Sequence, residues 1–132
     1  MVGILLVEDN PLIRETLSGL IAMEEDLSVL GGAGNGVEAL RLLDEGMKPD
    51  VVLADLNMPE MDGIELTENL KARYSAVKVI ILTMHVKATY LNRAIAAGAQ
   101  GYLLKDGDLE ELYKAIRKVH SGETYISGDI ND

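Results

Sequence analysis

The chain has 132 residues and no cysteine, a length that can bury a core as one domain and a composition that excludes disulfides, thiolate metal sites and cysteine nucleophiles. Its hydrophobic content of 48% excludes a disordered chain, and no apolar run approaches the ~18 residues of a membrane span. With 12 Lys and Arg residues against 22 Asp and Glu residues, the formal net charge of −10 repels nucleic-acid phosphates, so we expect this chain alone to be a poor nucleic-acid binder. Together these features indicate an acidic, soluble, cytoplasmic domain with no membrane partner.

In chain order, short apolar runs alternate with segments of helical period. The runs have strand length and are Val2 to Val7, Ser28 to Gly34, Val51 to Ala54, Val77 to Leu82 and Gly101 to Leu104. All but the second are nearly unbroken, a pattern typical of parallel strands that helices cover on both faces. The second run contains Gly31 and Gly32, which predict a short edge strand.

Each apolar run is followed by a segment with helical spacing and recognisable end signals. The helices are predicted from Asn10 to about Ile21, from Asn35 to Gly46, across Ile64 to Leu70, from Lys87 to Ala97 and from Asp108 to about Gly122. Asn10 and Asn35 are favourable N-caps, and Gly98 stands where a C-cap glycine belongs. Five such units require right-handed crossovers, so the sequence predicts an α/β fold with a parallel five-stranded sheet between two helix layers.

Polar side chains stand at the carboxyl ends of four of these strands. They are Glu8 and Asp9 after the first strand, Asp55 at the end of the third, Thr83 at the end of the fourth and Lys105 after the fifth. Because ligands bind outside the carboxyl ends of an open α/β sheet, we expect these groups to converge on one site. Clustered carboxylates without His or Cys suit a hard cation such as Mg²⁺, which would also relieve their mutual repulsion.

The residue types of this cluster are those that phosphoryl transfer requires. An Asp at a strand end beside a cation is a candidate nucleophile toward phosphorus, as in aspartyl-phosphate enzymes. Lys105 and the metal would neutralise the phosphoryl oxygens, and Thr83 would donate a hydrogen bond to one of them. Taken singly, Asp55 is a capping residue, Thr83 an ordinary strand residue and Lys105 a solvated charge. The interpretation as a phosphoryl-transfer site therefore depends on all of these residues standing together at neighbouring strand ends.

In this order and context the set resembles the receiver domains of two-component response regulators. That family carries an acidic pair after the first strand, a phosphoacceptor Asp after the third, Ser or Thr after the fourth and Lys after the fifth. The segment from Asp55 to Gly63 is similar to the loop after the phosphoacceptor, and Gly98 to Lys105 is similar to the signature of the fifth strand. The resemblance covers residues 2–121 and implies a flavodoxin-like, doubly wound (βα)5 sandwich with strand order 2-1-3-4-5.

The resemblance also implies the chemistry of the site. A sensor histidine kinase would transfer a phosphoryl group from its phosphohistidine to Asp55. Mg²⁺ would be held by Asp9, Asp55 and the backbone carbonyl of Asn57, with Glu8 nearby and acting through water. Such a domain catalyses only its own phosphorylation and dephosphorylation, so it is a regulatory phosphoprotein and not a turnover enzyme.

The resemblance further implies a conformational switch. The phosphate on Asp55 would draw in Thr83, and Tyr102 would swing inward to fill the vacated space. This change would rearrange the face made by the fourth helix, fifth strand and fifth helix, which is the usual surface for a homodimer or another partner. Physically, it is a bistable packing element biased by one local charge.

One departure from the family pattern narrows the resemblance. Asp106 follows Lys105, at a position where many receivers carry a proline. The Lys-Asp pair and the Gly-Tyr-Leu-Leu before it resemble the corresponding segment of receivers that are joined to LuxR-type helix-turn-helix domains, the NarL/FixJ subfamily. We therefore expect residues 1–121 to form the receiver domain and residues 122–132 to be a tail or the start of a linker. Regulation of transcription and contact with DNA would belong to an output domain outside this chain.

Other functions share parts of this pattern. A phosphatase of the haloacid-dehalogenase type places its nucleophile after the first strand and needs a second Asp two residues later. Here the candidate nucleophile Asp55 follows the third strand and Asn57 stands two residues later, so both features count against this class. A flavodoxin-like binding protein needs a phosphate-cradling loop where Glu8 and Asp9 would repel a phosphate. A stand-alone receiver that acts by protein contact alone remains an alternative. His85 and His120 have no second ligand nearby in the sequence and are expected at the surface.

Overall fold

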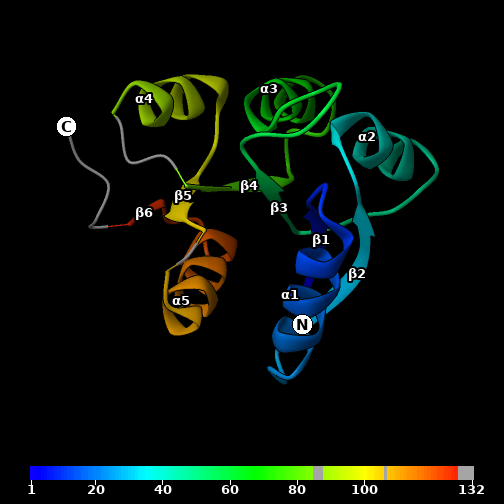
Figure 1. Cartoon of the computed structure of the whole chain (residues 1–132), viewed down its shortest axis with the longest axis vertical. Helices are drawn as coiled ribbons and strands as arrows, with labels where there is room; N and C mark the ends of the chain where they lie inside the picture. Colours follow the sequence, from blue (N-terminus) through cyan, green and yellow to red (C-terminus); the bar gives the residue numbers. More distant parts are fainter. Residues whose placement is uncertain (85–87, 106, 128–132) are drawn as a thin grey trace.

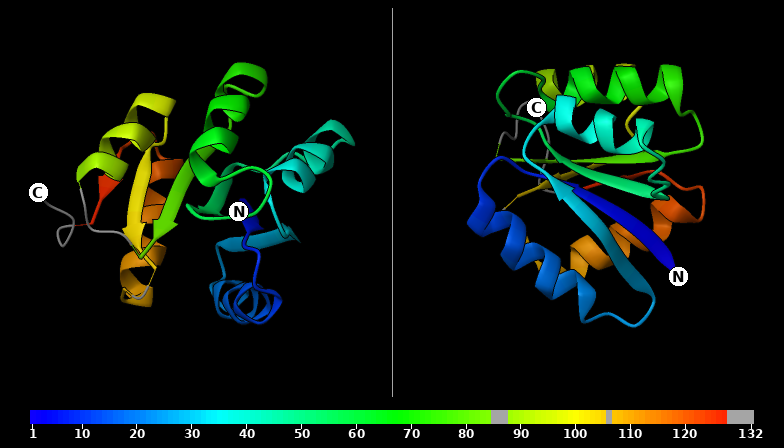
Figure 2. Two further views of the ribbon diagram at one scale, coloured as in Figure 1. Left: turned by 45° about the horizontal axis from the view of Figure 1, so that its top comes forward. Right: turned by 90° about the vertical axis from the view of Figure 1, so that its right-hand side faces the viewer.

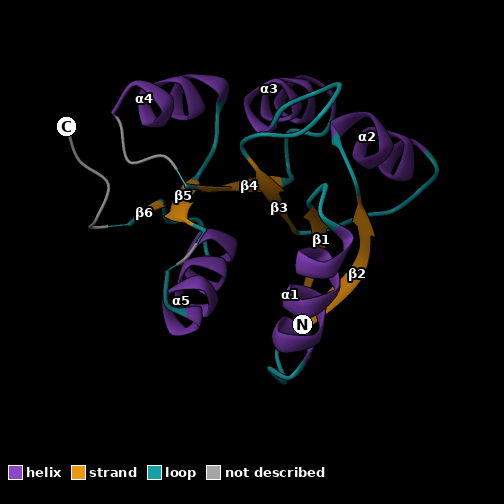
Figure 3. Ribbon diagram, in the orientation of Figure 1, coloured by secondary structure: helices purple, strands orange, loops and turns teal. Residues whose placement is uncertain are grey.

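The computed structural model describes residues 1–84, 88–105 and 107–127, in which strands and helices alternate in the predicted order. The strands are β1 (Val2–Val7), β2 (Leu27–Ala33), β3 (Val51–Asp55), β4 (Lys78–Thr83), β5 (Gly101–Leu104) and β6 (Tyr125–Ile126). The helices are α1 (Pro11–Ala22), α2 (Gly36–Asp44), α3 (Gly63–Arg73), α4 (Ala88–Ala97) and α5 (Leu109–His120). Figure 3 distinguishes the two kinds of element by colour.

The helix ends are fixed by side chains that the sequence predicts as caps. The Asn10 side chain accepts hydrogen bonds from two first-turn amides of α1 at 3.0 and 3.3 Å, and the Asn35 side chain accepts one from α2 at 2.8 Å. Gly98, after α4, has a φ of +108°, which is the backbone conformation expected of a C-cap glycine. The predicted start of this helix at Lys87, and the predicted surface position of His85, lie outside the described residues.

The strands form one parallel sheet in the order β2-β1-β3-β4-β5-β6. Helices α2, α3 and α4 cover one face and α1 and α5 cover the other, as Figures 1 and 2 show. Successive side chains of a strand enter opposite cores: Leu5 and Val7 pack with α2 to α4, whereas Ile4 and Leu6 pack with α1 and α5. Burial on both faces explains why the strands are continuous apolar runs, and the predicted flavodoxin-like order 2-1-3-4-5 is confirmed.

The sheet has six strands, one more than the five that the sequence predicts. Tyr125 and Ile126 lie in the stretch predicted as a tail or linker start, but they pair in parallel with β5. The Tyr125 amide donates to the Gln100 carbonyl and the Ser127 amide donates to the Tyr102 carbonyl, both at 2.9 Å. The ordered sheet therefore continues beyond the end of α5.

Glu111 of α5 holds β6 through both oxygens of its carboxylate. Its Oε2 accepts a hydrogen bond from the Tyr125 hydroxyl at 3.0 Å, and its Oε1 accepts one from the Ser127 hydroxyl at 3.3 Å. Ser127 is buried as a result. A strand of two residues gains little from its own ladder, so these side-chain contacts account for its position.

Replacement of Glu111 by alanine is expected to loosen β6 while the rest of the domain stays folded. Two hydrogen bonds worth about 1 kcal/mol each are lost, so hydrogen exchange of the Ser127 amide should accelerate by roughly tenfold or more. Exchange measured by NMR tests this, with Glu110→Ala at the exposed neighbouring position as the matched control. Equal exchange rates in the two variants would show that Glu111 does not hold the strand.

Gly63 brings the start of α3 against the end of β3, where Asp55 stands. Its amide donates to the Leu56 carbonyl at 2.9 Å, and a Cβ at this position would lie 2.5 Å from the Asp55 carbonyl oxygen. No side chain fits at that distance. The Asp-Gly pair at Asp62 and Gly63 thus combines an N-cap with a close approach of helix to strand.

Gly63→Ala is expected to lower the free energy of unfolding by about 1–3 kcal/mol, because the added methyl group displaces the backbone of β3 or α3. The control is Gly19→Ala in α1, where an added Cβ meets no atom within 4 Å. That substitution should raise the stability by up to about 1 kcal/mol through helix propensity. Urea denaturation of both variants provides the measurement, and equal stability in the two would contradict the close approach.

Candidate functional site

The polar residues at the strand ends lie along one edge of the sheet. Asp55 and Thr83 are the last residues of β3 and β4, and Glu8 and Lys105 directly follow β1 and β5. Glu8, Asp55 and Thr83 are buried at 3%, 7% and 0% exposure, whereas Asp9 is exposed. Buried polar groups require partners, so the contacts among these residues define the site.

Lys105 is the cation that links the buried carboxylates. Its Nζ lies 2.6 Å from Glu8 Oε1 and 3.0 Å from Asp55 Oδ2. Its backbone amide donates to the Thr83 carbonyl at 2.7 Å, which fixes the start of the side chain beside the end of β4. The site therefore joins residues that lie up to 97 positions apart in the chain around one ammonium group.

The protonation of Lys105 follows from these contacts. Burial acts to lower the pKa of its ammonium, but the hydrogen bonds and negative charges of Glu8 and Asp55 outweigh burial and raise the pKa above its ordinary value. A folded-state pKa above the unfolded one means that the stabilisation is complete at neutral pH and is lost only as the pH rises through the raised value. Lys105 is thus a fixed positive charge throughout the physiological range.

Three carboxylates meet beside Lys105. Glu8, Asp9 and Asp55 each offer an oxygen that lies within 4.8 Å of the others. Three such groups with one ammonium leave two negative charges uncompensated, and their donors are all oxygens. Both properties fit a hard divalent cation such as Mg²⁺. The amide of Asn57 donates to Asp55 Oδ1 at 3.4 Å, so the backbone nitrogen of Asn57 lies beside this carboxylate.

Glu8 has a second contact that fixes its side chain. Its Oε2 accepts a hydrogen bond from the Asn10 amide at 2.9 Å, while its Oε1 pairs with Lys105. Both oxygens are therefore engaged with the protein.

Tyr102 of β5 lies inside the domain. Its ring is 1% exposed, and its hydroxyl is buried with no hydrogen-bond partner among the described residues. Burial raises the pKa of this hydroxyl, an effect that the nearby side chain of Thr83 partly offsets. The inward position that the sequence analysis expects of the phosphorylated state is therefore already present in this structure.

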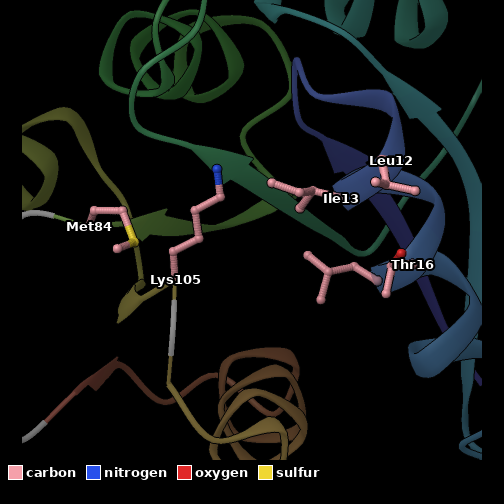
Figure 4. A pocket seen from close by; sticks show the side chains of 6 residues that line it. Leu12, Ile13, Thr16, Met84 and Lys105 are labelled. Carbon is pink, nitrogen blue, oxygen red and sulfur yellow. The ribbon is translucent and has the colours of Figure 1, made fainter.

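An apolar groove of about 560 Å³ opens beside Lys105. In Figure 4, Lys105 and Met84 line one side of it, and Leu12, Ile13 and Thr16 of α1 line the other. Leu12 and Met84 are 71% and 61% exposed, so the groove presents apolar surface to the solvent. This groove is not predictable from the sequence, because Leu12 and Met84 meet across it only in the folded chain.

Comparison with known proteins gives a consistent picture. A family model described as the response regulator receiver domain matches residues 4–117. The uncharacterized transcriptional regulatory protein YvfU of Bacillus subtilis (strain 168) is 39% identical over 130 residues, which are 98% of this chain and 64% of that protein. The nitrate/nitrite response regulator protein NarL of Escherichia coli (strain K12) is 36% identical over 124 residues, which are 94% of this chain and 57% of that protein.

Solved structures agree with these similarities. A two-component response regulator of the LuxR family from Aurantimonas sp. SI85-9A1 superposes with a TM-score of 0.93 at 36% identity, over 98% of this chain and 92% of that one. The signal receiver domain of the response regulator NarL from Mycobacterium tuberculosis has a TM-score of 0.86 at 30% identity, over 92% and 98% of the two chains. The chain spans between about half and two-thirds of the length of the curated relatives it matches. Within the described ranges, every helix is too short or too polar to cross a bilayer.

Lys105→Met is expected to leave Glu8 and Asp55 as adjacent negative charges. In EDTA at neutral pH the free energy of unfolding should fall by about 1–3 kcal/mol, which is less than for a fully buried pair because solvent screens the site. Mg²⁺ should then stabilise this variant more than the unmodified protein, since the metal replaces the missing positive charge. Urea denaturation with and without Mg²⁺ measures both effects, and Lys114→Met on the exposed side of α5 is the control. A variant that loses no stability in EDTA would contradict the assigned role.

Proposed function

The chain belongs to the response regulator receiver domains, and from this membership we propose that it is a phosphorylation-dependent switch whose phosphoacceptor is Asp55. The observation that carries the proposal is the position of Lys105, whose Nζ lies 3.0 Å from Asp55 Oδ2. That ammonium group already stands where a phosphoryl group attached to Asp55 would need a counter-charge. In this proposal Asp55 is the residue that reacts, and Lys105 is one of the groups that assist it.

Asp55 is held as a nucleophile by its neighbours. The Asn57 amide contacts Oδ1 and the Lys105 ammonium contacts Oδ2, so the carboxylate has a fixed orientation at the end of β3. An oxygen of this carboxylate would attack the phosphorus of a phosphohistidine, and the phosphorus–nitrogen bond of the donor would break. No general base is required, because an aspartate is ionised at neutral pH. Lys105 would then exchange its contact with Asp55 for a contact with a phosphoryl oxygen.

The residues that would hold a magnesium ion are Asp9, Asp55 and the backbone carbonyl of Asn57, with Glu8 acting through water. The all-oxygen donor set and the two uncompensated charges support this assignment. When bound, the metal supplies positive charge that offsets the phosphoryl oxygens during transfer. Asp9, the exposed member of the set, would be the residue that first meets an incoming cation.

The phosphoryl donor in this proposal is a sensor histidine kinase. A kinase must bring its histidine to the carboxylate edge of the sheet, and the apolar groove beside Lys105 supports docking at that place. Leu12 and Met84, on opposite sides of the groove, would lose their exposure to water when the kinase binds. The domain would catalyse only its own phosphorylation and dephosphorylation.

The signal would leave the site through Thr83 and β5. Thr83 would turn toward the phosphoryl group, and the buried Tyr102 would respond to that movement because its hydroxyl lies near Thr83. The Tyr102 carbonyl accepts a hydrogen bond from Ser127, so a displacement of β5 would reach β6 and the chain that follows it. Residues 122–132 would then be the start of a linker whose first part, β6, is paired with the sheet. The surface of α4, β5 and α5 would serve a homodimer, with β6 along its edge.

The output in this proposal is transcription. Several relatives are transcriptional regulators, and this chain matches only part of their length, so DNA binding would reside in a domain that lies outside residues 1–132. The net charge of −10 supports this division, because such a domain repels DNA phosphates. Family membership further supports a cytoplasmic location.

Incubation with acetyl phosphate tests the proposed chemistry directly. Intact-mass spectrometry is expected to show one phosphoryl adduct that forms with Mg²⁺, is absent with EDTA and is absent from Asp55→Asn. The matched control is Asp50→Asn, at the opposite end of β3, which should still form the adduct.

Two results would contradict the proposal. An adduct on Asp55→Asn would assign the reaction to another residue. No adduct on the folded, magnesium-loaded protein, either from acetyl phosphate or from phosphorylated kinases, would leave only a receiver that acts by protein contact.

A further inference from the structure

Arg14 in α1 reaches back to the loop that carries the acidic pair. Its Nη1 donates a hydrogen bond to the Glu8 carbonyl at 2.5 Å. The Glu8 amide donates in turn to the Ala33 carbonyl at 2.9 Å, and the Glu8 carboxylate is held by Asn10 and Lys105. Every polar group of Glu8 thus has a protein partner, and Arg14 supplies the contact to the peptide that joins Glu8 to Asp9.

Glycines in and after β2 keep a space open for the Arg14 side chain. A Cβ at Gly32 would lie 2.9 Å from Arg14 Cδ, and a Cβ at Gly34 would lie 3.7 Å from Arg14 Nη1. In the sequence, the glycines of this run indicate only a short edge strand. In the structure, the missing side chain of Gly32 gives the arginine its route to the Glu8 carbonyl.

Asp9 depends on that peptide for its orientation. Its side chain is exposed, and among the described residues no hydrogen bond or ion pair holds it. The direction in which the Asp9 carboxylate points therefore follows from the backbone before and after it. The Glu8 carbonyl is one side of that backbone, and Asn10, the cap of α1, is the other.

A guanidinium beside an acidic site has two opposed effects on cation binding. Its charge repels a divalent cation, which lowers the affinity, although water and salt partly screen this effect because Arg14 is only half-buried. Its hydrogen bond removes motion from the ligand loop, which raises the affinity, and partners that orient metal ligands typically change metal affinity by about 10–100-fold. The two effects predict opposite results when the arginine is removed.

We propose that Arg14 is a positioning residue for the acidic site: by holding the Glu8 carbonyl, it fixes the peptide that orients Asp9 and so raises the affinity for Mg²⁺. The inference rests on the proposed function in assigning Mg²⁺ to this site, but it concerns the ligand loop and not the phosphorylation of Asp55. Arg14 touches neither the phosphoryl group nor the cation in this role.

Calorimetric titration of Mg²⁺ into four proteins tests the inference without any phosphoryl donor. Arg14→Ala is expected to raise the Mg²⁺ dissociation constant about tenfold relative to the unmodified protein. Gly32→Val keeps the arginine but fills its space, and should weaken Mg²⁺ binding in the same direction. Arg41→Ala, which removes an exposed arginine of α2, is the matched control and should bind Mg²⁺ as the unmodified protein does.

A second measurement separates positioning from general destabilisation. In metal-free protein, hydrogen exchange of the Asp9 and Asn10 amides should accelerate in Arg14→Ala, while amides in the centre of β3 exchange as before. If Arg14→Ala does not fold, Gly32→Val carries the same test.

Unchanged or tighter Mg²⁺ binding in Arg14→Ala would overturn the inference, and tighter binding would show that charge repulsion dominates. The proposed function fails by a different result, which is the absence of an adduct on unmodified protein that binds Mg²⁺. The two failures are therefore distinguishable.

Discussion

The ammonium group of Lys105 is the charge on which the site depends. The sheet order places β4 between β5 and β3, so a side chain that starts after β5 must cross the end of β4 to reach Asp55. Two strand spacings are about 10 Å, a span that the long arm of lysine and the facing carboxylates cover together. The same Nζ also reaches Glu8 beyond β3. One flexible cation thereby joins residues from three of the six parallel strands, β1, β3 and β5, at the carboxyl edge and allows two carboxylates to be buried side by side.

The position of Lys105 directly after β5 connects the positive charge of the site to the strand that would carry its signal. The backbone of Lys105 is bonded to Thr83, and the residues just before it are β5 with the buried Tyr102. A change of partners at the Lys105 ammonium would therefore act first on β4 and β5, to which the Lys105 backbone is directly connected. Because β6 adds to β5 through the Tyr102 carbonyl, the order of contacts runs from the acidic edge to the segment after α5. The proposed switch needs no long pathway, since neighbouring strands of one sheet provide it.

Much of this arrangement is predictable from the sequence, for identifiable physical reasons. Continuous apolar runs fix the strands, capping residues such as Asn10 and Asn35 fix the helix starts, and parallel topology brings Asp55, Thr83 and Lys105 to one edge. The rest depends on contacts between distant residues. β6 has two residues and is held by Glu111, so it carries no pattern of its own. The contact of Arg14 depends on Gly32, which lies on another element, and its spacing in the chain gives no sign of the interaction.

Lys105 and Arg14 show two different uses of positive charge in an acidic domain. The net charge of −10 attracts divalent cations to the whole surface, but screening limits such attraction to about 8–10 Å, so it cannot select one site. Selection requires oxygens held at fixed positions. Lys105 makes it possible to bury the carboxylates of Glu8 and Asp55, whereas Arg14 binds a backbone carbonyl and acts on the geometry of the loop. Lys105 thus balances the charge of the carboxylates, and Arg14 restricts the motion of the ligand loop. A site built from mutually repelling groups needs both contributions.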